Sequence, residues 1–136
     1  MPSSPADGEA ERWSRGVAAY ASQFRIEPEQ VFEHMSGLLG ERMASEAINA
    51  AAAAWADDVL SLRDRSLIVL AALATQGGVE PRMRPHVRWA IEHGATAEEL
   101  EAMATLLAVY IGYPRASVAM EVIRDTLAEM ESAGSG

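Results

Sequence analysis

The chain has 136 residues and a net charge of −9, and it contains no cysteine, which excludes disulfides, thiol redox chemistry and thiolate metal ligation. Hydrophobic residues make up 49% of the chain and aromatic residues only 6%, so we expect one all-α core with about seven helices. The acidic excess without any basic tract argues against a nucleic-acid partner. No apolar run approaches the roughly 20 residues of a membrane span, and we expect a cytoplasmic protein without membrane contact.

The predicted helices follow one another through short connections and form a single domain over residues 11–131. Segments rich in small and polar residues at 1–10 and 132–136 predict flexible ends. The expected helices cover approximately residues 10–24, 28 to 37 or 40, 41–56, 62–75, 81–93, 97–110 and 114–130.

Several of these helix ends carry a local sequence signal. Pro28 suits the first turn of a helix, because its missing N–H would have no partner there. Ser61 is a predicted N-cap, and Thr96 with Glu99 has the spacing of a capping box. Gly77 follows the central apolar helix and is expected to end it.

The helix expected at 97–111 has more apolar residues than one core contact requires. Its apolar positions are Leu100, Met103, Leu106, Leu107, Val109, Tyr110 and Ile111. A subunit interface would cover the surplus, which predicts a homo-oligomer.

The three histidines do not have the spacing of a metal site. His86 and His93 are seven residues apart, about 10 Å along a helix, which is too far to share one ion. His34 has no ligand pair three or four residues away, so no metal is expected. His86 lies at the edge of an apolar helical face, where it either exchanges a proton with a ligand or hydrogen-bonds to a backbone carbonyl.

Other candidate residues lie in the same apolar helices. Arg65 and Arg84 suit carboxylate recognition, and they equally suit structural ion pairs with nearby acidic residues. Ser66 lacks the surroundings of a nucleophile and is expected to line a site or to bond to backbone. Trp55 and Tyr110 could cover an organic substrate or belong to the core or an interface.

Four segments read together resemble the carboxymuconolactone decarboxylase family, in the cysteine-free branch of the alkylhydroperoxidase D-like superfamily. The segments are LSLRDRSLIVLAAL at 60–73, RPHVR at 84–88, HGATAEEL at 93–100 and AVYIGYP at 108–114. The resemblance covers roughly residues 55–127. Peroxidases of this superfamily use a Cys-x-x-Cys pair before a histidine. Val79 and Arg82 occupy those positions here, which excludes a thiol peroxidase.

The resemblance implies an all-α subunit of a trimer or hexamer that needs no cofactor. The implied reaction removes carbon dioxide from 4-carboxymuconolactone, giving the 3-oxoadipate enol-lactone of aromatic-acid catabolism. In that reading His86 donates a proton, Arg65 and Arg84 hold the carboxylate or the developing oxyanion, and Ser66, Trp55 and Tyr110 contact the substrate.

The chain departs from the family pattern at residues 79–81 and at Pro85. These departures leave two alternatives open. One is a decarboxylase, isomerase or cyclase acting on another carbonyl acid in specialised metabolism. The other is a non-catalytic oligomeric protein that binds a small organic acid or lactone.

Overall fold

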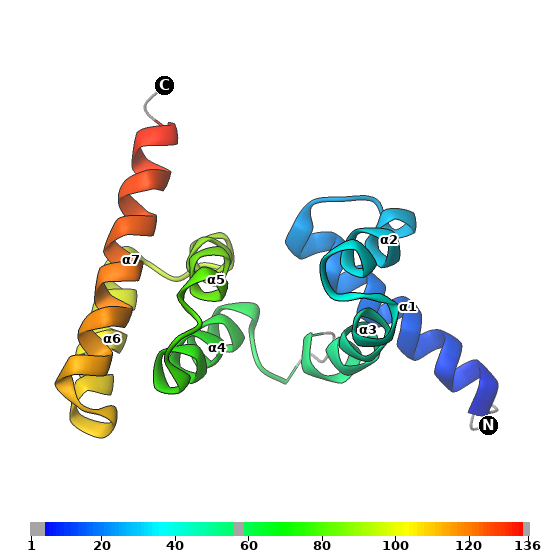
Figure 1. Cartoon of the computed structure of the whole chain (residues 1–136), viewed down its shortest axis with the longest axis horizontal. Coiled ribbons are helices and arrows are strands. Elements are labelled where there is room, and N and C mark those ends of the chain that lie inside the picture. Colours follow the sequence, from blue (N-terminus) through cyan, green and yellow to red (C-terminus); the bar gives the residue numbers. More distant parts are fainter. Residues whose placement is uncertain (1–4, 56–58, 135–136) are drawn as a thin grey trace. The chain divides into compact units, whose positions relative to one another are not determined.

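The computed structural model describes residues 5–55 and 59–134, and every regular element in these ranges is an α-helix. The helices are α1 Pro5–Phe24, α2 Pro28–Leu39, α3 Glu41–Trp55, α4 Leu62–Gln76, α5 Glu80–Glu92, α6 Ala97–Ile111 and α7 Tyr113–Gly134 (Figure 1). The prediction of an all-α chain with seven helices is therefore confirmed. No helix of the described ranges is long and apolar enough to cross a bilayer.

Several predicted caps are present at the helix ends. The Ser61 hydroxyl accepts a hydrogen bond from the Asp64 amide at 3.0 Å, and Thr96 forms a reciprocal capping box with Glu99. Gly77 follows α4 with φ 71°, a left-handed value that favours glycine. The last carbonyls of α4 at Thr75 and Gln76 accept hydrogen bonds from the Arg115 guanidinium at 2.6 and 3.3 Å.

The two outermost helices are longer than predicted. α1 begins at Pro5 instead of near residue 10, and α7 continues to Gly134 instead of ending near residue 130. A proline fits the first turn of a helix, and acidic residues nearby are favourable at its N-terminus. At the other end, neither glycine nor proline interrupts the chain between 115 and 133.

The chain divides into two compact units, Met1–Val59 and Leu60–Gly136. In the first unit, α1, α2 and α3 pack around Ala21, Val31, Met35, Ala44 and Ile48. α1 and α3 approach closely at Gly16, where the absence of a side chain leaves room for the backbone of Ile48. A Cβ added to Gly16 would overlap the Ile48 carbonyl. The single domain over 11–131 stays a prediction.

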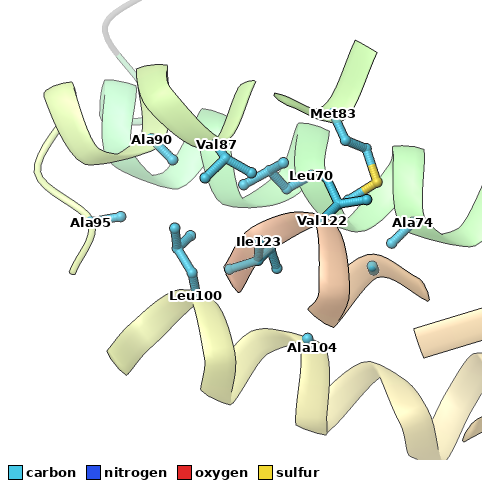
Figure 2. Packing of buried hydrophobic residues seen from close by; sticks show 11 residues of the cluster. Leu70, Ala74, Met83, Val87, Ala90, Ala95, Leu100, Ala104, Val122 and Ile123 are labelled. Atoms are coloured by element: carbon cyan, nitrogen blue, oxygen red, sulfur yellow. The ribbon is translucent and has the colours of Figure 1, made fainter. Parts of the chain in front are cut away.

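The second unit comprises α4 to α7 around a separate core. Figure 2 shows Leu70, Val87, Leu100 and Ile123 gathered from the four helices, and each is fully buried. α5 packs against both α4 and α7. This packing leaves α5 with one side next to α4 and another next to α7, and its polar residues divide between the two.

Candidate functional site

α5 carries two separate sets of polar residues on different sides. At 3.6 residues per turn, His86, Trp89 and His93 fall on one side of the helix, and Arg84 and Arg88 fall on the opposite side. The buried residues Met83, Val87 and Ala90 lie between these two sides and face the core. The two sets are therefore held apart by the core face of the same helix.

A side-chain hydrogen bond connects α4 to the side of α5 that carries His86, Trp89 and His93, called the histidine side below. The Ser66 hydroxyl oxygen lies 2.7 Å from His93 Nδ1. Ser66 is in the second turn of α4 and only 1% exposed, and His93 is the C-cap residue of α5. The bond therefore holds the start of α4 against the end of α5, as an antiparallel helix pair requires.

His86 lies two turns before His93 and is mostly buried. Its Nδ1 is inaccessible to solvent and has no hydrogen-bond partner among the described residues. Its ring meets the Trp89 ring edge to face, with centroids 4.7 Å apart. Burial, followed by the charge of His93, lowers the pKa of His86 from 6.5 to about 4. The imidazole is therefore neutral at pH 7.

His93 also has a lowered pKa. Burial disfavours its charged form, and the neighbouring Glu92 carboxylate partly opposes this effect. Because a charged His93 lowers the pKa of His86, protonation of the two histidines is coupled.

Arg65 precedes Ser66 on α4 and is buried, with 7% of its surface exposed. A buried guanidinium keeps its charge, so α4 brings a permanent positive charge into the second unit close to the serine that holds His93. Two residues earlier, Arg63 forms ion pairs with Asp64 and with Glu99 of α6. The pair with Glu99 joins the N-terminal ends of α4 and α6.

The structure does not bring Arg84 to the histidine side of α5. The Arg84 guanidinium lies 3.1 Å from one carboxylate oxygen of Glu129 on α7, and Arg88 lies 3.2 Å from the other. Arg84 thus forms an ion pair within the chain, with a partner on α7 instead of one of the acidic residues near it in the sequence. Pro85 lies within α5, which continues through it from Glu80 to Glu92.

The two predicted aromatic substrate contacts lie in different units. Trp55 is the half-buried last residue of α3 in the first unit. Tyr110 is on α6 in the second unit and 78% exposed, so within one chain its side chain is open to solvent.

Trp89 and His93 lie on the same side of α5 as His86 and were not among the predicted site residues. The signal was present in the sequence, since residues 86, 89 and 93 have the spacing of one helical face. No group of three or more histidine, aspartate or glutamate residues able to hold a metal occurs in the described ranges.

A family model described as carboxymuconolactone decarboxylase family matches residues 43–125, from α3 to α7. The chain belongs to the carboxymuconolactone decarboxylase family. The match begins at the third residue of α3, earlier than the sequence resemblance, and includes every predicted site residue. No curated protein matches the chain.

Membership of the carboxymuconolactone decarboxylase family indicates which chemistry to compare with the residues on the histidine side of α5. The family is named for the loss of a carboxyl group, which leaves negative charge on the substrate and requires a proton at carbon. In the second unit, a buried imidazole and a buried guanidinium are the residue types that such chemistry uses.

Proposed function

We propose that the protein is a cofactor-independent carbon–carbon lyase that decarboxylates 4-carboxymuconolactone or a closely similar lactone acid. The observation that carries this proposal is His86, a buried imidazole whose Nδ1 has no hydrogen-bond partner in the described ranges, in a chain of the decarboxylase family. A buried nitrogen without a partner is costly in a resting protein, and a ligand that bonds to it would remove that cost.

In the proposed reaction, the bond between the lactone ring and its carboxyl carbon breaks and carbon dioxide leaves. The electron pair of that bond enters the conjugated lactone, whose carbonyl oxygen takes up negative charge. A proton then adds to a ring carbon and gives the enol-lactone. We assign the proton to His86 and the stabilisation of the oxyanion to Arg65.

The low pKa of His86 determines when it can act as an acid. Protonating a group with a pKa of about 4 at pH 7 costs about 4 kcal/mol. A substrate carboxylate about 4 Å away supplies roughly 4 kcal/mol at the effective dielectric constant of a protein surface. The two terms are of the same size, so substrate binding is sufficient to bring a proton onto His86. The free protein keeps this histidine neutral.

Trp89 suits a role in excluding water. Its ring packs against His86 edge to face and thereby limits access to the imidazole from one direction. An imidazole that is shielded from water transfers its proton to the substrate carbon with less competing proton exchange with solvent. We therefore assign Trp89 to the site in addition to Ser66 and His93, which hold the end of α5 in place.

A second candidate is the same chemistry on another carbonyl acid. The observation that favours it is the Arg84 ion pair with Glu129, because this arginine of the family-like Arg-x-His pattern is engaged within the chain. A substrate with a different arrangement of acid groups would then be expected.

The test is carbon dioxide release from freshly generated 4-carboxymuconolactone, with wild-type protein beside His86→Ala and Arg84→Ala. We expect turnover by the wild type, its loss in His86→Ala, and retention in Arg84→Ala. No release by a folded wild-type protein would reject this substrate. A panel of other unsaturated lactone acids and β-keto acids would then test the second candidate, and failure of all of them would favour a non-catalytic binding protein.

A further inference from the structure

Arg82 lies one helical turn before His86 on the same side of α5. Residues 82, 86, 89 and 93 are spaced by four, three and four positions, so Arg82 continues the side formed by His86, Trp89 and His93. Side chains four residues apart on a helix have Cβ atoms about 5 to 6 Å from each other. The Arg82 side chain is exposed, at the solvent end of this row.

Arg82 differs from the other arginines of the second unit in having no partner. The side chains that pair with carboxylates are those of Arg63, Arg84, Arg88 and Arg124. The Arg115 side chain donates to a carbonyl at the end of α4. Arg65 is buried. Over residues 59–134, no hydrogen bond or ion pair involves the Arg82 guanidinium. Glu80, the acidic residue nearest in sequence, accepts a hydrogen bond from the Gly78 amide.

An unpaired guanidinium is notable in a chain that carries 20 acidic residues against 11 basic ones. A free arginine one turn from a buried imidazole offers two parallel N–H groups to a planar anion that also reaches the imidazole. We propose that Arg82 binds the carboxylate that the substrate keeps, an inference that rests on the proposed decarboxylation.

The choice of the retained carboxylate follows from the energetics of the reaction. The proposed substrate has two carboxylates, of which one leaves as carbon dioxide. A cation bound to the departing carboxylate would stabilise the substrate more than the transition state, because the negative charge moves away from it. A cation bound to the retained carboxylate stabilises both states equally. Arg82 therefore contributes to binding and orientation and leaves the chemical step unchanged.

The kinetic test compares Arg82→Gln with Arg88→Gln, since both remove one exposed arginine from the same helix. We expect Arg82→Gln to raise KM roughly 10- to 100-fold while kcat changes less than about threefold. Arg88→Gln is expected to keep both constants near the wild-type values. An unchanged KM in Arg82→Gln, or an equal rise in both variants, would overturn the inference.

A binding test separates this inference from the proposed reaction. The probe is 5-oxotetrahydrofuran-2-acetate, a saturated lactone with one carboxylate that cannot decarboxylate by this route, beside its methyl ester. We expect the wild type and Arg88→Gln to bind the acid at least about tenfold more tightly than the ester, and Arg82→Gln to bind both alike. A preference for the acid that survives in Arg82→Gln contradicts the inference. Loss of that preference supports a carboxylate site at Arg82 even if no carbon dioxide is released by the wild type.

Discussion

The Ser66 hydroxyl and His93 Nδ1 lie 2.7 Å apart and join the start of α4 to the end of α5. A hydroxyl can donate to a neutral imidazole and accept from a protonated one, so this bond persists in both states of His93. It fixes the position of the His93 charge relative to His86, two turns earlier on the same side of α5. On the other packed side of α5, Arg84 and Arg88 each form an ion pair with Glu129 of α7.

We expect His93→Gln to raise the pKa of His86 above its wild-type value of about 4. The positive charge of a protonated His93 opposes the addition of a proton to His86 and so lowers the pKa of His86. Glutamine keeps a hydrogen-bonding side chain without that charge. The measurement is an NMR titration of the histidine ring protons. His34→Gln, a change in the first unit, is the control and is expected to leave His86 unchanged. A His86 midpoint that does not move in His93→Gln would refute the coupling.

The stability of the protein is expected to fall as the pH decreases from 6.5 to about 4. His86 has a lower pKa when folded than the ordinary 6.5 of an unfolded chain, so the unfolded state binds more protons in this range. The free energy of unfolding should therefore decrease by roughly 3 kcal/mol through His86 and level off below its folded pKa. Urea unfolding followed by circular dichroism at several pH values measures this. The same series on His86→Gln should show a shallower decrease, and identical curves for both proteins would speak against a buried neutral His86.

Gly16→Ala is expected to destabilise the first unit by roughly 2 to 3 kcal/mol, because the added methyl group overlaps the Ile48 carbonyl where α1 crosses α3. Gly37→Ala provides the matched control. An added Cβ at Gly37 meets nothing within 4 Å, and alanine favours a helix, so this variant should gain up to about 1 kcal/mol. Thermal and urea unfolding by circular dichroism compare the two. Equal stability of both variants would show that the helices do not cross closely at Gly16.

Tyr110→Glu is expected to reduce self-association. Leu106, Val109, Tyr110 and Tyr113 are 60%, 78%, 78% and 77% exposed, and no charged residue occurs between 102 and 114. We propose that this face of α6 and the start of α7 packs against other copies in the predicted trimer or hexamer. Sedimentation velocity should show an oligomer for the wild type and smaller species for Tyr110→Glu. Ala128→Glu adds the same charge to an exposed position of α7 and should leave the oligomer intact. A monomeric wild type would rule the proposal out.

Much of the fold could be predicted because its signals are local. The caps at Ser61 and Thr96 depend on residues three positions apart, and the apolar periodicity of α4 to α7 predicted a buried core. The site was only partly predictable. Residues 84 and 86 are neighbours in the sequence, yet two positions turn a helix by more than half a revolution, and this places Arg84 opposite His86.

The remaining features depend on contacts between helices. Ser66 and His93 are 27 residues apart, and only the antiparallel packing of α4 and α5 brings them together. Glu129 lies 45 residues after Arg84 and determines the role of that arginine. Local patterns contain no information about such pairs. The shared side of His86 and His93 follows from their spacing in the sequence, whereas the bond of His93 to Ser66 is visible only in the packed structure.

In the proposed reaction, His86 protonates the substrate carbon after carbon dioxide has left. The most direct measurement is product analysis by NMR in D₂O, with 4-carboxymuconolactone and either wild-type protein or His86→Gln. We predict that the wild type accelerates the loss of carbon dioxide and places one deuteron on a single face of the ring carbon. His86→Gln should give only the uncatalysed rate and deuterium on both faces. Equal rate and equal facial selectivity in the two proteins would contradict the claim.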